Sequence, residues 1–454
     1  MKKISYRSVA IEKISVAVLV GLLSGAKKLV VSIDVAKTKM MAGFGSEDGT
    51  VVRLVRFVNP CQTRAFVDLV VQTGKALGVP TEALMEPTGT YGDGLRRLLG
   101  EGGVAVWMLS PKRVHDAREV FDGVPSLHDA KSCVVMAQLH RQGGSRIYEE
   151  ASEERRGFRA LVDRRQVWTK PLQMHLGQLE ALLSRHWPEL LSTMDVWKRR
   201  TPLRLLAEHG CPAEVVAHAQ EARALMRSAS RRKLNEAKIA AVIDSARASI
   251  GLPVLPSERV LIAEVAQEAL RLRDAIGQLD KEIEAQATLS EVTEPIAAVV
   301  GRVTAVVLVA YLGPLSEYGS AAALEKACGL NLKIKSSGNV SGRPSITKRG
   351  SPIARAYLYL AAVRMVRLDA RVGAWYRSRS SYREDRKIVA LVAVMRKLVR
   401  ALWHVARGAS FDSSKLVDVR ALPAGAVPVE LLLREAPLPT THDAICFTQS
   451  NAMP

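Results

Sequence analysis

The sequence predicts an α/β plus α protein: a mixed-sheet domain, a helical coiled-coil middle and a mostly helical C-terminal domain. Short apolar runs separated by turns fill the chain from Leu29 to about Gly144, whereas helical periodicity dominates from about Ala151 onward. The 454 residues suffice for two or three domains, and 48% of them are apolar. A mainly disordered chain is therefore excluded, because too much apolar surface would remain in water.

The N-terminal part alternates strands and helices. Three apolar runs form a predicted meander, and two further strands each follow a helical stretch. The predicted strands lie at 29–34, 40–45, 51–57, 83–86 and 104–109, and the predicted helices at 63–77, 91–99 and 112–121. The order βββαβαβ, followed by a helix, is that of an RNase H-like sheet.

We expect five segments along the chain. In the first, the apolar run 14–24 is a short packed segment, because it is too short to span a bilayer and no small-residue cleavage pattern follows it. No later run qualifies as a membrane span, so no membrane partner is expected. The segments are an N-terminal extension (1–28), the RNase H-like domain (29–150), a helical coiled-coil region (151–290), a C-terminal domain (291–410) and a tail (411–454).

One helical stretch of the middle region carries a heptad-like seam. Its apolar residues recur at alternating spacings of three and four: Ile262, Val265, Ala269, Leu272, Ile276, Leu279 and Ile283. A coiled coil or a long helical hairpin is the first interpretation. A single amphipathic helix packed on its own domain is the alternative, because about three heptads barely distinguish the two.

The positive charge is concentrated near the C-terminus. The chain carries a net +20, and residues 331–407 hold 18 Lys and Arg against three acids, a net +15. Such an excess of one sign indicates contact with phosphates, so we expect a nucleic-acid partner. The five cysteines are widely separated and form no CxxC pair, which argues against a disulfide framework or a structural zinc site and fits a reducing cytoplasm.

Three carboxylates occupy positions that suit a metal site. Asp34 ends the first predicted strand, Glu86 lies at the end of the fourth, and Asp129 opens a helix with a buriable face. Carboxylates that converge from separate elements can hold divalent cations for phosphodiester chemistry, and Mg²⁺ prefers such oxygen ligands. Each acid alone is an ordinary cap or solvated group, so the prediction depends on the three together.

The stretch 333–362 combines serines, glycines and cations. A serine in such a loop could attack a phosphodiester if a base or metal assists it, and cations would stabilise the developing charge. The alternative is a flexible loop that grips phosphate through backbone N–H groups and hydroxyls. The cations expected to contact nucleic acid are Lys333, Lys335, Arg343, Lys348, Arg349 and Arg355.

Several of these motifs resemble one family. SIDVAK, MEPTGTYG and the helix that begins with Asp129 and Ala130 are similar to the N-terminal domain of the DEDD transposases of the insertion sequence one-ten family, which includes bridge-RNA-guided recombinases. The stretches 295–313 and 328–330, together with SSG followed by KRGSPIARAYLYLAA, resemble its C-terminal domain. The resemblance covers about half of the chain.

The resemblance implies a RuvC-like N-terminal domain in which Asp34, Glu86 and Asp129 hold Mg²⁺. It also implies a serine nucleophile in the C-terminal transposase domain. Ser337, which precedes a glycine, matches best, and Ser336 and Ser341 stay as alternatives.

The fourth metal ligand of the family pattern does not carry over. The family usually shows DxxDA, but Ser126 stands three residues before Asp129. His128 is a weak substitute, and Asp122 would share the helical face only if the helix continued through Gly123 and Pro125. Three carboxylates plus water remain a sensible site.

The predicted function is therefore that of a DNA transposase or recombinase acting on element ends and target. The resemblance implies a structured guide RNA and a homo-oligomer, a dimer or tetramer joined through the coiled coil, in which one chain's serine meets another's carboxylates. Two alternatives stay open: a metal-dependent junction resolvase or nuclease that uses water, and an inactive basic scaffold.

Overall fold

The structure, a computed structural model, contains two compact units, Met1–Glu150 and Ala151–Pro454. The structure describes residues 6–87, 89–126, 128–334, 336–337, 340–342, 345–380 and 384–417. Within these ranges, no helix has both the length and the apolar composition that crossing a membrane would require.

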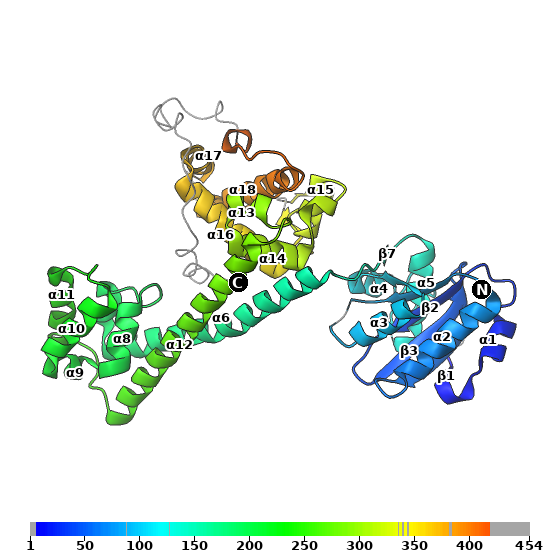
Figure 1. Cartoon of the computed structure of the whole chain (residues 1–454), viewed down its shortest axis with the longest axis horizontal. Helices are drawn as coiled ribbons and strands as arrows, with labels where there is room; N and C mark the ends of the chain where they lie inside the picture. Colours follow the sequence, from blue (N-terminus) through cyan, green and yellow to red (C-terminus); the bar gives the residue numbers. More distant parts are fainter. Residues whose placement is uncertain are drawn as a thin grey trace. The chain divides into compact units, whose positions relative to one another are not determined.

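The first unit is built on a seven-stranded mixed sheet with the order β1-β4-β3-β2-β5-β6-β7 (Figure 1). The antiparallel meander β2-β3-β4 is followed by β5 and β6, which run parallel to β2. The strands are β1 (Ser8–Ala10), β2 (Leu29–Asp34), β3 (Lys39–Ser46), β4 (Val51–Val58), β5 (Thr81–Met85), β6 (Ala105–Met108) and β7 (Arg146–Ile147). The predicted mixed α/β sheet is confirmed, and from β2 to α4 the elements follow the predicted order βββαβαβα along the chain.

Two edge elements of the sheet were not predicted. β1 pairs in parallel with β4, and β7 pairs antiparallel with β6. The run at 14–24 contains helix α1 (Val16–Leu22), and Leu19 and Leu23 are buried, as expected of a packed segment. Strands of three and two residues are too short to show a period of two in the sequence.

Helices cover both faces of the sheet. α1, α2 (Thr63–Leu77) and α3 (Asp93–Glu101) share one core with Leu29, Val31 and Ile33 of β2. On the other face, α4 (Pro111–Asp116) and α5 (Asp129–Arg141) pack against Val30. Because side chains alternate along a strand, Asp34 belongs to the face that α5 covers. The predicted helix 112–121 ends early, at α4, and hydrogen-bonded turns follow it.

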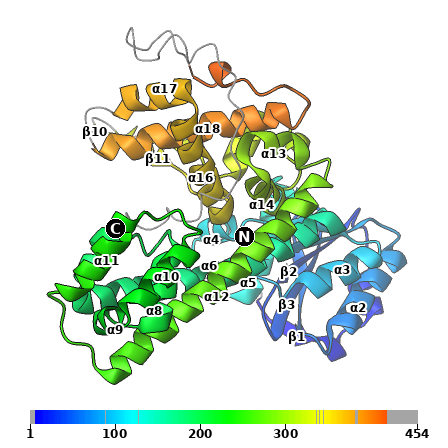
Figure 2. The same cartoon turned by 60° about the vertical axis from the view of Figure 1, so that its left-hand side comes forward.

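The second unit is organised around two long helices, α6 (Glu153–His186) and α12 (Pro256–Thr288), which lie side by side (Figures 1 and 2). All seven residues of the predicted heptad seam are buried. The seam packs within the chain, on α6 and on α8 (Arg200–His209). A coiled coil between protomers stays a prediction, and the α12 seam is already used inside the chain.

Each end of the long pair belongs to a separate core. One core joins the pair to the small helices α7 to α11, and the other joins it to α13 to α18. The helices of the first core, besides α8, are α7 (Pro188–Thr193), α9 (Pro212–Ala217), α10 (Ala219–Ala229) and α11 (Glu236–Arg247). Those of the second are α13 (Glu294–Val300), α14 (Arg302–Leu312), α15 (Ala321–Ala327), α16 (Pro352–Leu368), α17 (Ala370–Ser380) and α18 (Glu384–Val405).

A buried arginine ties the long helices to the second core. Arg165 on α6 is 8% exposed. Its Nε donates to Asp280 Oδ1 on α12 at 2.6 Å, and its Nη1 donates to the hydroxyl of Tyr357 on α16 at 2.7 Å. One guanidinium thus connects three helices that are far apart in the sequence.

Removing the carboxylate of this cluster should destabilise the second unit. Asp280→Ala leaves the Arg165 charge buried and unpaired, which costs about 3–5 kcal/mol in the free energy of unfolding. Urea denaturation of the full chain measures the change. Asp274→Ala on the same helix is the control, because Asp274 pairs with Arg200 at an exposed site and should cost only about 0–1 kcal/mol. Equal losses in the two variants would contradict a special role for the buried pair.

Candidate active site

Two of the predicted carboxylates lie next to each other at one edge of the sheet. Asp34 is the last residue of β2, and Glu86 follows the last residue of β5. The two strands are parallel, and Ile33 pairs with Met85, so Asp34 and Glu86 occupy the next position on each strand. Alternation along both strands directs them to the face that α5 covers.

The third carboxylate begins the helix that covers this face. Asp129 is the first residue of α5, and Ser132 is buried one turn later. Burial and the charge of Asp129 raise the pKa of Asp34 above its ordinary value, whereas a hydrogen bond with the Ser132 side chain lowers it. The start of α5 therefore lies near the end of β2, on the face of the sheet where α5 packs against Val30.

Burial and the charge of Asp34 raise the pKa of Glu86 to about 7. Asp34 therefore interacts unfavourably with a carboxylate on either side, and a bound cation would relieve this repulsion. The donor set, three carboxylates from three elements, fits a hard divalent cation. Among the described residues, however, no group of three or more His, Cys, Asp or Glu side chains is close enough to hold a metal ion. Asp34 and Glu86 share an edge of the sheet and Asp129 begins the helix that covers it, but the three do not form a closed ligand shell.

Asp122, considered above as a fourth ligand, has other partners. Its Oδ1 accepts a hydrogen bond from Lys131 Nζ at 2.7 Å, and its Oδ2 accepts one from the Tyr6 hydroxyl at 2.8 Å. The bond from Lys131, supported by the backbone N–H of Val124, lowers the pKa of Asp122 to about 2. Asp122 lies in the turns before α5, so the helix through Gly123 and Pro125 that a shared face with Asp129 would require is not formed.

His128 and Ser126 also lie before the helix. His128 is the N-cap of α5, and its Nδ1 accepts from the backbone N–H of Lys131 at 3.3 Å. Its ring meets that of Tyr6 edge-on, with the centroids 4.8 Å apart. Ser126 is exposed. The cap gives His128 a structural task, because it satisfies one of the orphan N–H groups of the helix start.

Lys131 helps to position the site, a role that was not predicted from the sequence. Its side chain is 2% exposed, and its Nζ also donates to the carbonyl of Val124 at 2.6 Å. The cluster Tyr6–Asp122–Lys131 therefore holds the segment before α5 against the helix, two residues from Asp129. A lysine inside the buriable stretch Ala130–Ala137 was the available signal, since lysines are seldom fully buried without a partner.

The three candidate serines lie on one small hairpin. β9 (Ser336–Ser337) pairs antiparallel with β10 (Val340–Ser341), so Ser337 is opposite Val340, and Ser336 is opposite Ser341. β8 (Leu332–Lys333) and β11 (Ser345–Ile346) pair outside them. The expected Gly-flanked loop is therefore a nested pair of short strands. The predicted contacts Lys335 and Arg343 lie outside the described residues.

The cationic turn that follows the hairpin packs closely on the turn after α15. Gly329 has φ +69°, and a Cβ on Gly350 would lie 2.1 Å from the carbonyl oxygen of Ala327. Arg355 Nη1 donates to the carbonyls of Cys328 and Gly350 at 3.2 and 3.0 Å. The motifs CGL and KRG thus meet in space, and Arg355, predicted to contact nucleic acid, connects them. Lys333, Lys348 and Arg349 are exposed.

Two family models match the chain. The model of the DEDD transposases of the IS110 type, described as a transposase, matches residues 31–188. The model described as the transposase IS116/IS110/IS902 family matches residues 298–377. Together they cover a little over half of the sequence. No curated protein matches it.

Neutralising Asp122 should change how the melting temperature of the protein depends on pH. A carboxylate whose folded pKa is lowered to about 2 contributes stability that is complete above its ordinary pKa of 3.8 and is lost as the pH falls toward 2. Asp122→Asn should therefore melt at a lower temperature than the wild type near neutral pH, and the difference should shrink on acidification. Calorimetry over this pH range measures it.

Asp68→Asn, at an exposed position of α2, is the matched control and should follow the wild type throughout. Parallel pH profiles for Asp122→Asn and the wild type would show that the cluster does not hold this segment.

Proposed function

Because the chain belongs to the IS110 family of DEDD transposases, we propose that it cleaves and rejoins DNA through a serine nucleophile acting with a carboxylate site for divalent cations. Family membership makes it a DNA transposase or recombinase; the serine, the cation and the guide are proposals. The observation that supports the cation site is the alignment of Asp34 and Glu86 on one edge and face of the sheet, beside the helix that Asp129 begins.

The proposed cation site consists of Asp34, Glu86 and Asp129, and Mg²⁺ is the ion that these oxygen ligands suit best. A bound divalent cation would lower the barrier by stabilising negative charge on the phosphoryl and leaving oxygens. The chain's own contribution is to hold the carboxylates in position. The sheet register aligns Asp34 with Glu86, and the Tyr6–Asp122–Lys131 cluster holds the start of α5.

In the proposed reaction, the Ser337 hydroxyl attacks a DNA phosphorus. A bond between the serine oxygen and phosphorus replaces the bond to the departing strand, whose oxygen takes up a proton as the serine gives one up. A second strand end then reverses the step and releases the serine. Phosphate binding there is supported by three exposed cations: Lys333 on the outer strand β8 of the hairpin, and Lys348 and Arg349 in the turn after it.

We further propose that the active form is a homo-oligomer guided by a structured RNA encoded by the element. The +15 excess over residues 331–407 suits RNA and DNA alike. The α12 seam is buried within the chain, so contact between copies would use another face. We place that contact on the outer face of α6, because this face exposes two apolar residues seven positions apart, Val167 and Met174.

Trapping of a covalent adduct tests the serine. Wild-type protein, labelled element-end DNA, Mg²⁺ and the co-expressed flanking RNA should give a protein–DNA band on a denaturing gel. Ser337→Ala should remove the band and reduce strand exchange by about 10³-fold or more, because no other group supplies the nucleophile. Ser345→Ala, on the outer strand of the same hairpin, should leave both unchanged. A band that survives Ser337→Ala overturns the assignment, and cleavage without a band indicates water as the nucleophile.

Thermal melting tests the cation site without requiring activity. At about ten times the dissociation constant, Mg²⁺ or Mn²⁺ should raise the melting temperature of the first unit by about 3–6 °C. The shift should be largest above pH 7, because Glu86, with a pKa of about 7, must be ionised to bind. Asp34→Asn should abolish the shift, and Asp68→Asn should retain it. An equal shift in Asp34→Asn would exclude this site.

A further inference from the structure

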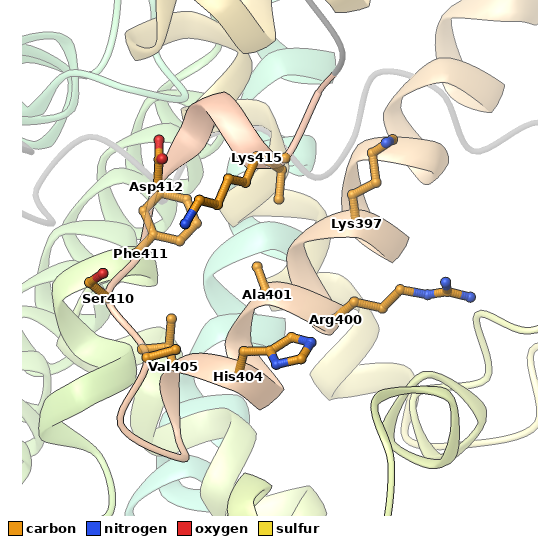
Figure 3. A pocket seen from close by; sticks show the side chains of 11 residues that line it. Lys397, Arg400, Ala401, His404, Val405, Ser410, Phe411, Asp412 and Lys415 are labelled. Carbon is orange, nitrogen blue, oxygen red and sulfur yellow. The ribbon is translucent and has the colours of Figure 1, made fainter.

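A basic cavity of about 550 Å³ lies in the second unit between α18 and residues 409–417 (Figure 3). The side chains that matter here are Lys397, Arg400, His404, Phe411, Asp412 and Lys415. Its volume is within the range of sites for small organic ligands, and a nucleotide is of that size. None of its lining residues belongs to the proposed cation site or to the serine hairpin.

The cavity is strongly biased toward anions. Lys397, Arg400 and Lys415 contribute three permanent positive charges, and Asp412 is the one carboxylate among its lining residues. Asp412 Oδ1 already accepts hydrogen bonds from the backbone N–H and the hydroxyl of Ser414, at 2.9 and 2.7 Å. From residue 386 to residue 411, the sequence has six Lys and Arg and no Asp or Glu.

One of these cations is held in place by a buried acid. The side chain of Glu325 on α15 is only 3% exposed, and its two oxygens accept from Arg396 Nε and Arg400 Nε at 2.6 and 2.7 Å. The Arg400 side chain is nevertheless 54% exposed. A guanidinium bound through Nε at its inner edge presents its outer edge to an incoming ligand, and planar donors of this kind suit phosphate oxygens.

The cavity also offers flat apolar surface. Figure 3 shows Phe411 and Lys415 on one side and Ala401, Val405 and the ring of His404 on the other. Phe411 is half-buried, and His404 is exposed. Aromatic rings that alternate with cations are the combination by which proteins bind unpaired bases and their phosphates.

We propose that this cavity binds one unpaired nucleotide of a nucleic-acid strand, with its phosphate on the cations and its base against Phe411. The inference rests on the proposed function, in which nucleic acid is the substrate. A strand is favoured over a free nucleotide because positive charge continues outside the cavity at Arg407, which is exposed and follows the end of α18. Such a pocket would hold a base that is flipped out or lies beyond a duplex end.

Binding of full-length protein to labelled oligothymidylate of about 16 nucleotides tests the proposal, with fluorescence anisotropy read at several salt concentrations without divalent cation. Phe411→Ala should weaken binding about fivefold or more, because the stacking surface is lost. Lys415→Gln should weaken binding and lower the slope of log affinity against log salt by about 0.7, because one phosphate contact is lost. Lys233→Gln, an exposed lysine near α11, makes the same charge change and should bind like the wild type.

The remaining arms identify the occupant. Blunt duplex DNA should bind Phe411→Ala as tightly as it binds the wild type. If Phe411→Ala loses as much affinity for the duplex as for the single strand, the cavity does not recognise an unpaired base. A mononucleotide that binds the wild type but not Phe411→Ala, and that the oligonucleotide does not displace, would contradict the proposal that the cavity binds a nucleotide of a strand. If Phe411→Ala and Lys415→Gln both bind with wild-type affinity, the cavity is not the binding site, but the proposed function still stands. If the wild-type chain binds no nucleic acid, the proposed function is contradicted as well.

Discussion

The buried contact of Arg165 with Asp280 and Tyr357 is the interaction on which the second unit depends. It connects α6, α12 and α16, and α16 starts directly after the cationic turn that follows the serine hairpin. A shift of α16 along the long helices would take the Tyr357 hydroxyl away from Arg165 and leave one donor of this buried guanidinium without its partner. A buried ion pair adds little net stability over apolar packing, so we infer that its value here is to specify one register of α6 against α12, on which the Tyr357 hydrogen bond then positions α16.

The first unit uses a different constraint, the alternation of side chains along parallel strands. Even-numbered residues of β2 and β5 face α5, which places Ser32, Asp34, Leu84 and Glu86 on one side of the sheet. A slip of one residue in either strand would turn its carboxylate toward the opposite helices. The apolar pattern that builds the core therefore also determines which face carries the acids.

This explains how much of the protein could be predicted from its sequence. The strands of the sheet follow from apolar runs, and Asp34 and Glu86 follow from their places at strand ends. The two-residue strands of the serine hairpin could not be predicted, because they show no period. The apolar seam of α12 was predicted, but its partner was not, since periodicity reveals an apolar face and not what covers it.

The roles of Lys131 and Asp122 depend on a contact between a turn and a helix, which sequence spacing does not report. The sequence predicted a site of three carboxylates plus water. In the described residues, Asp34 and Glu86 share an edge of the sheet and Asp129 begins the helix beside it, but no group of three is close enough to hold a metal ion.

The pairing of one buried glutamate with Arg396 and Arg400 has a consequence for recognition. Long basic side chains normally lose rotamer freedom when they bind a ligand, and this loss of entropy lowers the affinity. Here that ordering takes place when the chain folds, so the guanidinium of Arg400 meets its ligand already oriented. A cation held in this way responds to the direction of an approaching phosphate as well as to its charge. Lysine, a rotating point charge without an Nε anchor, would carry the same charge at this position but not the same selectivity.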